Sequence, residues 1–263
     1  MGNERLRGQM RLCGMSALDL ATALAIDPKT VERWLDKGRM PRQPQRSRAA
    51  KALDIDETYL WPQLLDDERA RSASRAEVQA VYPHRGAVPP DLWRRLLEST
   101  EHHIDVLVYA GLFLVDSHPD FPGLVADRAT QGLEARLLYG RPDSDVVTSR
   151  GQEERIGAHL SARIHLALTS VEPLIGLPGA EIRLHETVLY NSIYRFDDQM
   201  LVNTHVVGSP APQNPVLHLR RVPGGHLFEH YLRSFDRVWE MSKPLEVPLR
   251  DGSVGAWDAE STT

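Results

Sequence analysis

The apolar pattern of residues 103–140 places the strongest constraint on what this chain can fold into. Residues 103–115 (HIDVLVYAGLFLV) are a continuous, mostly apolar run, which is typical of a strand buried on both faces of a sheet. Residues 124–140 (LVADRATQGLEARLLYG) then show a helix, a turn at Gly132 and a second strand. A strand, a helix and a strand in this order predict two parallel strands joined by a crossover helix. We therefore expect this region to belong to an α/β domain.

Further helix and strand patterns continue this domain toward the C-terminus. Residues 152–174 have the spacing of a long amphipathic helix, and residues 225–242 have the spacing of a closing helix. Four segments between them have the composition of strands, namely 180–188, 189–197, 199–207 and 215–222. We expect residues 89–245 to form a mixed sheet flanked by helices. Residues 246–263 are small and polar, which favours a disordered tail.

Residues 1–65 show helical patterns only, so we expect an all-α domain there. In residues 16–26 (SALDLATALAI) the apolar side chains recur at helical spacing behind Ser16, a residue type that caps helix N-termini. A second start signal follows, with Asp27 as the N-cap and Pro28 at the first helical position. Two helices in close succession are therefore predicted near the N-terminus.

Charge divides the chain at about the same place as the change of pattern. Residues 1–50 hold ten Lys or Arg against five Asp or Glu, a balance of +5, so the other 213 residues carry −10. A basic segment attached to an acidic body predicts contact between that segment and a polyanion. Residues 66–88, which are charged and rich in Ser and Ala, are expected to be the linker between the two domains.

Residues 20–41 (LATALAIDPKTVERWLDKGRMP) fit the requirements of a DNA-reading helix-turn-helix. Such a motif needs a supporting helix, a tight turn and a second helix whose N-terminal side chains reach the base edges. The predicted DNA contacts are Lys29, Thr30, Glu32 and Arg33 on the second helix, with Arg39, Arg42 and Arg46 in the loop that follows. The alternatives are a helical pair of a protein-interaction domain and a basic solvated face.

Residues 9–65 resemble the lambda-repressor-like (XRE-type) helix-turn-helix regulators, and the stretch DPKTVERWLDKGRMP…YLWP is similar to a version of the actinobacterial type. The resemblance implies a transcriptional regulator that binds double-stranded DNA with sequence specificity. The N-terminus lacks the apolar core of a signal peptide, so we expect a cytoplasmic protein that is associated with the nucleoid when bound to DNA. No apolar run reaches the roughly 18–20 residues of a membrane-spanning helix, so no membrane partner is expected.

Residues 90–240 are similar in element order to one repeat of the phospholipase D superfamily. GLEARLLYGRPDSD (132–145) resembles the second strand of that repeat, and FDDQMLVNTHVVG (196–208) resembles its motif strand and turn. In that family a His-x-Lys-x4-Asp motif supplies the nucleophile and the phosphate-binding charge. Residues 52–242 contain no lysine, so this catalytic unit is incomplete. We therefore expect no catalytic residues, no metal and no cofactor, and a protein that is not an enzyme.

A polar cluster between Arg183 and Val207 marks a candidate ligand site. Its candidate residues are His185, Tyr190, Asn191, Tyr194, Arg195, Asp198, Asn203 and His205. Strand alternation places Ser192 and Tyr194 on one face of the hairpin and Arg195 on the other. Two interpretations stay open. The cluster forms a pocket for a small polar or phosphate-bearing effector, or it only satisfies the hydrogen bonds of a hairpin.

The hypothesis for the whole chain is a sequence-specific DNA-binding transcriptional regulator with a non-catalytic ligand-sensing and dimerisation domain. Phospholipase D enzymes set two repeats face to face, so a single repeat implies a homodimer that presents two DNA-binding domains. A homodimer favours a palindromic operator. One alternative is a DNA-targeted phosphodiesterase or nuclease of the phospholipase D type. The other is a regulator whose C-terminal domain is only a dimerisation module.

Overall fold

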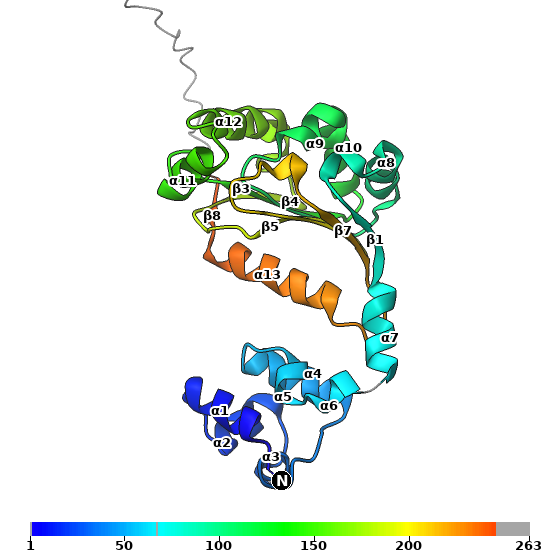
Figure 1. Cartoon of the computed structure of the whole chain (residues 1–263), viewed down its shortest axis with the longest axis vertical. Coiled ribbons are helices and arrows are strands. Elements are labelled where there is room, and N and C mark those ends of the chain that lie inside the picture. The colour runs from blue at the N-terminus through cyan, green and yellow to red at the C-terminus, as the bar shows by residue number, and fades with distance from the viewer. Residues whose placement is uncertain (1, 67, 246–263) are drawn as a thin grey trace, which may run out of the picture. The chain divides into compact units, whose positions relative to one another are not determined.

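A computed structural model describes residues 2–66 and 68–245 of the chain (Figure 1). The disordered tail that the sequence favours, residues 246–263, lies outside these described residues. Within the described ranges, no helix is long and apolar enough to cross a membrane.

The chain divides into two compact units. A helical unit runs up to Glu77 and also takes in Val222–His230, while a sheet unit comprises Val78–Arg221 and the described residues that follow from Tyr231 to residue 245. The helices of the first 77 residues are α1 (Glu4–Leu12), α2 (Ala17–Leu24), α3 (Pro28–Lys37), α4 (Gln43–Ala52), α5 (Glu57–Leu60), α6 (Gln63–Asp66) and α7 (Glu68–Glu77). The long helix α13 (Leu227–Met241) begins in the helical unit and continues in the sheet unit.

The helix start signals of the sequence are present in the helical unit. The Ser16 side chain accepts a hydrogen bond from the backbone N–H of Asp19 at the start of α2, and the Asp19 carboxylate accepts one from the backbone N–H of Ser16. Asp27 caps α3 through a backbone N–H two residues further on. The apolar faces of the helices meet at the buried Trp34 and Trp61, whose rings lie edge to face with centroids 6.2 Å apart.

The segment expected as a linker, residues 66–88, has regular structure instead. Helix α7 occupies its first half, and β1 (Val78–Tyr82) follows as a strand at the edge of the sheet, paired with β7 (Val216–Arg220). The short 3₁₀ helix η1 (Arg85–Ala87) comes next. Ala, Arg and Glu favour the helix, so a charged, Ala-rich stretch forms α7 rather than a loop. The sheet unit therefore starts at Val78 and not at residue 89.

One mixed sheet of eight strands forms the centre of the described part of the sheet unit. Its remaining strands are β2 (His103–Leu107), β3 (Glu134–Gly140), β4 (Ala180–His185), β5 (Asn191–Phe196), β6 (Gln199–Thr204) and β8 (Lys243–Pro244). The strand order is β1-β7-β6-β5-β2-β3-β4-β8. The pairs β2–β3 and β3–β4 are parallel, and the other pairs are antiparallel. The expected parallel pair and the α/β class of this region are confirmed.

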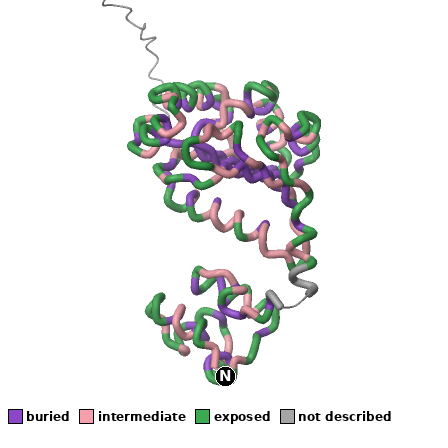
Figure 2. Tube along the Cα trace, viewed as in Figure 1, coloured by how far each residue is buried: buried purple, intermediate pink, exposed green. Residues whose placement is uncertain are grey.

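Helices cover both faces of this sheet. Four helices lie over one face, namely α8 (Pro90–Ser99), α9 (Leu112–Ser117), α10 (Phe121–Ala129) and α12 (His159–Val171) (Figure 1). Helix α11 (Asp145–Glu153) packs beside α12, and two short 3₁₀ helices are η2 (Glu172–Leu174) and η3 (Ala211–Gln213). The opposite face carries α13, whose Trp239 ring lies under the Arg183 guanidinium of β4. Buried residues follow the strands between these layers (Figure 2).

Two segments that were expected as single elements are divided in the structure. The strand of the run 103–115 ends at β2, and α9 begins after Gly111, whose φ of 61° lies in the left-handed region that glycine tolerates. The helix expected over residues 152–174 is divided into α11 and α12, with Gly157 at a φ of 51° between them. Apolar composition does not reveal the first break, because a short buried helix and a buried strand are equally apolar.

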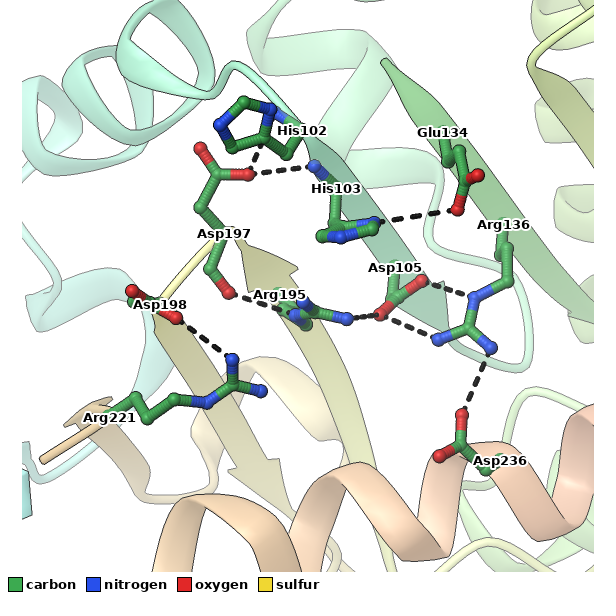
Figure 3. A network of polar contacts seen from close by, with 10 residues as sticks. All are labelled: His102, His103, Asp105, Glu134, Arg136, Arg195, Asp197, Asp198, Arg221 and Asp236. Carbon is green, nitrogen blue, oxygen red and sulfur yellow. Dashed lines mark hydrogen bonds and ion pairs between the residues drawn. The ribbon is translucent and has the colours of Figure 1, made fainter. Parts of the chain in front are cut away.

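A buried network of ion pairs ties three adjacent strands together (Figure 3). Asp105 of β2 is paired in register with Arg136 of β3 and with Arg195 of β5. Its carboxylate accepts hydrogen bonds from Arg136 Nε at 2.7 Å and from Arg195 Nη1 at 2.8 Å, and the residue is 1% exposed. Arg136 Nη1 also donates to Asp236 of α13 at 3.0 Å. The network therefore fixes the register of the central strands and joins the sheet to α13.

Replacing Asp105 with Ala is expected to lower the free energy of unfolding of the sheet unit by about 3–5 kcal/mol, because two arginines lose their buried counter-ion. Urea unfolding followed by far-UV circular dichroism measures the change. The control is Asp91→Ala, which removes an exposed ion pair with Arg94 and is expected to change the free energy by less than about 1 kcal/mol. Equal effects of the two substitutions would contradict the role of the network.

Candidate nucleic-acid interface and ligand pocket

Helix α3 separates an apolar face from a polar face. Val31, Trp34 and Leu35 are buried in the helical unit. The positions predicted to contact DNA are Lys29, Glu32 and Arg33, which are exposed, and Thr30, which is partly exposed. The first turns of α3 thus present polar side chains of the types that read base edges in a DNA groove.

Three arginines surround a hollow beside α3. The hollow has a volume of about 270 Å³, and Arg33, Arg39 and Arg42 contribute to its lining together with Thr30 and Gln45. Among the described residues, none of these three guanidinium groups forms an ion pair with a carboxylate. Guanidinium groups without acidic partners produce a local positive potential and can bind phosphate oxygens in pairs of hydrogen bonds.

Arg46, the remaining predicted DNA contact, does not belong to this group. It lies within α4 rather than in a loop, because that helix begins at Gln43 with Pro44 in its first turn, where proline is tolerated. Its Nη1 donates to the Pro41 carbonyl oxygen at 3.1 Å, and its Nε lies 3.5 Å from Glu57 Oε2. The side chain is 14% exposed. Arg46 therefore holds α4 to α5 and is not available to DNA in this structure.

The sheet unit contains a pocket of about 300 Å³. The segment after β2, the strand β5, the end of β6 and the helix α12 contribute to its lining. Its polar lining residues are Arg85, Tyr109, Asp116, Glu154, Arg163, Ser192, Tyr194 and His205. Of the ligand residues predicted from the sequence, Tyr194 and His205 line this pocket and the others do not. In the described parts of the chain, no group of three or more His, Cys, Asp or Glu side chains is placed to hold a metal ion.

Strand alternation separates Arg195 from Tyr194, as the sequence predicts. The Tyr194 ring packs edge to face on Trp93 of α8 with centroids 5.1 Å apart, whereas Arg195 points into the buried ion-pair network on the other face. Asp198 lies at the hairpin turn, where its carboxylate pairs with Arg221 at 3.0 Å (Figure 3). Arg195 and Asp198 thus have structural partners outside the pocket.

Three further predicted ligand residues also lie outside the pocket lining. Asn203 is buried, and its Nδ2 donates to the carbonyl oxygens of Asn214 and Pro215 at 3.1 and 3.2 Å. Tyr190 is 80% exposed, and Asn191 at the start of β5 is partly exposed. For Asn203 the structure fits the interpretation of a polar side chain that satisfies the backbone of a neighbouring loop.

His185 is 2% exposed at the end of β4. Its Nδ1 accepts a hydrogen bond from the backbone N–H of Thr187 at 3.3 Å, so Nε2 carries the proton and donates to the Val108 carbonyl oxygen at 3.0 Å. Burial lowers the pKa of His185 below its ordinary value. The ring is therefore neutral, with both nitrogens engaged by the backbone.

His205 and Ser192 form a hydrogen-bonded pair on the wall of the pocket. The Leu189 carbonyl oxygen can only accept, so His205 Nδ1, at 3.1 Å, carries the ring proton. His205 Nε2 then accepts from the Ser192 hydroxyl at 3.1 Å. The Ser192 and Arg85 side chains lie near the Tyr194 hydroxyl, and burial raises the pKa of Tyr194. The two hydrogen bonds of His205 thus fix the orientation of its imidazole and of the Ser192 hydroxyl on the pocket wall.

The environment of the pocket keeps His205 uncharged. Burial is the main cause that lowers the pKa of His205 to about 4, and the positive charges of Arg150 and Arg85 add to it. The imidazole is consequently neutral near pH 7 and acts there as a hydrogen-bonding group rather than as a cation.

Sequence reasoning missed several residues that line the pocket. Arg85 lies in the segment taken for a linker, Tyr109 lies in an apolar run, and Arg163 lies on α12. None belongs to the polar cluster between Arg183 and Val207. They have no common sequence pattern, because the strand pairing of the sheet brings them together from distant segments.

Comparisons with known proteins give distant likenesses only. No protein family model and no curated protein matches the sequence. Among solved structures, the chain is similar to TrmBL2, described as an archaeal chromatin protein with a novel mode of DNA binding, with 12% identity, a TM-score of 0.39, and coverage of 84% of this chain and 72% of that one. It is also similar to Nuc, a phospholipase D family member from Salmonella typhimurium, with 11% identity, a TM-score of 0.37, and coverage of 64% and 96%. Likenesses at this level carry no functional argument.

The sheet unit is expected to lose stability as the pH falls from about 6.5 to about 4. In the unfolded chain His205 binds a proton near its ordinary pKa of about 6.5, whereas its folded pKa is about 4. Between these two pKa values the unfolded state binds more protons than the folded state. The free energy of unfolding therefore decreases as the pH falls through this range, by on the order of 3 kcal/mol for this group. Urea unfolding at pH values above, within and below the window measures the slope.

His205→Asn is expected to flatten this dependence of stability on pH. The control is His159→Asn, a substitution of an exposed histidine on α12 that should leave the slope as it is. Burial also lowers the pKa of His185 and of His218, so some slope of the same sign remains in both variants. An unchanged slope in His205→Asn would show that this residue does not titrate as described.

Proposed function

We propose that the chain is a sequence-specific DNA-binding transcriptional regulator whose sheet unit binds a ligand and does not catalyse a reaction. The DNA-binding part is carried by one observation, the exposed polar face of α3 beside a hollow lined by three arginines. In this proposal base edges are read by Lys29, Thr30, Glu32 and Arg33, and DNA phosphates are bound by Arg39 and Arg42.

The charge distribution supports this proposal. Residues 1–50 carry a balance of +5 although the whole chain carries −5. Neutralisation of DNA phosphates by Lys and Arg releases counterions and supplies most of the non-specific affinity for DNA. The resemblance of residues 9–65 to the lambda-repressor-like regulators supports the same assignment.

The proposal includes a homodimer that binds a palindromic operator of double-stranded DNA. Its support is the resemblance of residues 90–240 to a single repeat of a family that sets two repeats face to face. A two-fold symmetric dimer would present two copies of α3 to two half-sites. Light scattering coupled to size-exclusion chromatography gives the mass, and a monomer at concentrations that saturate the operator would exclude this part.

The arrangement of the histidines supports a sheet unit without catalysis. The imidazoles of His185 and His205 each have both ring nitrogens in hydrogen bonds. Neither residue therefore has a free nitrogen to attack phosphorus. Ser192 and His205 have the connectivity of a nucleophile and a base. However, an imidazole with a pKa of about 4 is a weak base at neutral pH, which favours a binding role over proton abstraction.

Arg33→Ala and Lys29→Ala are each expected to weaken binding to a selected operator by roughly tenfold, the loss of a good base-edge contact. Arg39→Ala and Arg42→Ala are expected to weaken specific and random DNA alike, and each should reduce the salt slope of the affinity by about 1. Fluorescence anisotropy titrations at several salt concentrations, on an operator selected from a random pool, measure these changes.

The matched control for these variants is Arg11→Ala. Arg11 is exposed and basic, but it belongs to α1 and does not line the hollow. Its replacement should leave the discrimination between operator and random DNA unchanged. Wild-type affinity in all four test variants would count against α3 as the reading helix.

The chain is expected to give no turnover of bis(4-nitrophenyl) phosphate above that of the buffer, because neither histidine offers a free nitrogen. Release of 4-nitrophenol followed by absorbance measures the rate. Turnover that disappears in His205→Ala or in His185→Ala would overturn the non-catalytic assignment and favour the DNA-targeted phosphodiesterase instead.

A further inference from the structure

Arg85 is the charged group on the pocket wall whose partners define what the pocket can hold. It is partly exposed, and its guanidinium lies over the Phe113 ring at 4.0 Å from the centroid. It also lies near the Tyr194 hydroxyl. Among the described residues, Arg85 forms no ion pair with a carboxylate. By contrast, Arg150 of the same unit pairs with Glu153 and Glu154.

The contacts of Arg85 orient it without neutralising it. An aromatic ring below and a neutral hydroxyl beside the guanidinium hold its plane, but neither carries a compensating negative charge. A guanidinium has five N–H donors, and its ring contact and a single hydroxyl leave most of them available to a bound oxyanion. A partly buried cation in this state binds an anion more strongly than an arginine that is free in solvent, because its orientation is already fixed.

Most other polar groups of the pocket wall are already engaged within the protein. The Tyr109 hydroxyl oxygen accepts from the Leu189 backbone N–H at 2.9 Å. His205 and Ser192 are engaged with each other and with the backbone. Arg163 is exposed at the pocket and, in the described part of the chain, has no acidic partner either.

The acidic residues of the lining do not cancel the preference of the pocket for an anion. Glu154 is neutralised by Arg150 at 2.7 Å. Asp116 and Arg163 are both exposed, where solvent screens their opposite charges alike, so the partly buried Arg85 decides the preference. Between these polar groups the wall is apolar, formed by Val108, Ala110, Leu112, Phe113, Leu160 and Pro212. A volume of about 300 Å³ lies at the lower end of the range for small-molecule sites, roughly 300–1,000 Å³.

We propose that this pocket binds a small organic acid, with its oxyanion held by Arg85 and its apolar body packed on Phe113, Leu112 and Leu160. The inference rests on the ligand-binding role proposed for the sheet unit and names the ligand class. A carboxylate and a phosphate share the required chemistry, an oxyanion that accepts several N–H and O–H donors. The neutral His205 then serves to hold the Ser192 hydroxyl in place.

The test is ligand-observed ¹⁹F NMR with four probes of one shape and different charge. 4-Fluorobenzoate and 4-fluorophenyl phosphate carry the two kinds of oxyanion, 4-fluorobenzamide is neutral, and 4-fluorobenzylamine is cationic. Either acid, or both, should bind the full chain at least roughly tenfold more tightly than the amide, and the amine should bind least. The ratio between the benzoate and the phosphate identifies the preferred oxyanion.

Arg85→Gln should reduce the affinity for the acids by roughly tenfold or more and leave the amide unaffected. The control is Arg95→Gln, which replaces an exposed arginine of α8 outside the pocket lining and should not change binding. Circular dichroism confirms that the variants are folded.

Three results would overturn the inference. They are equal binding of the benzamide and the benzoate, unchanged acid binding in folded Arg85→Gln, and no binding of either acid at millimolar concentration. DNA titrations of the same preparations separate this outcome from the proposed function. Operator binding without acid binding removes the ligand class alone, whereas acid binding without operator binding removes the DNA-binding role alone.

Discussion

The buried carboxylate of Asp105 is the interaction on which the sheet unit depends. A charge that is 1% exposed is tolerated only where opposite charges and hydrogen bonds surround it. Its two arginine partners are its direct neighbours in register on β3 and β5. A shift of either strand by one residue would turn that partner to the other face of the sheet. The network therefore selects one register for the central strands.

This register assigns two kinds of chemistry to the two faces of β5. Arg195 is directed into the network, while Ser192 and Tyr194 are directed to the pocket. On the pocket side, hydrogen bonds to Ser192 and to the Leu189 carbonyl oxygen then fix the His205 imidazole in one neutral tautomer. The buried Asp105 carboxylate thus influences the geometry of the pocket through the strand register, although it does not contact the pocket.

Much of the fold could be predicted from the sequence because its signals are local. Ser16 and Asp27 mark helix starts through hydrogen bonds that span two or three residues, and the strand pattern around β2 and β3 gives the parallel pair. The same local signals could not predict the break after β2 or the strand β1 within the expected linker. Composition does not distinguish a short buried helix from a strand, and an edge strand depends on a partner, β7, that lies far away in the chain.

The sequence by itself determined the two-part organisation, the basic N-terminal segment, the polar positions of α3 and the absence of lysine from residues 52–242. These are properties of composition and of spacing within one element. Tertiary structure alone decided which polar residues meet. It placed Arg85, Tyr194 and His205 on the wall of one pocket, directed Arg195 and Asp198 to structural partners, and turned Arg46 toward Glu57. The physical reason is that a site depends on distances between side chains, and for residues far apart in the sequence these distances are set by strand register and helix packing.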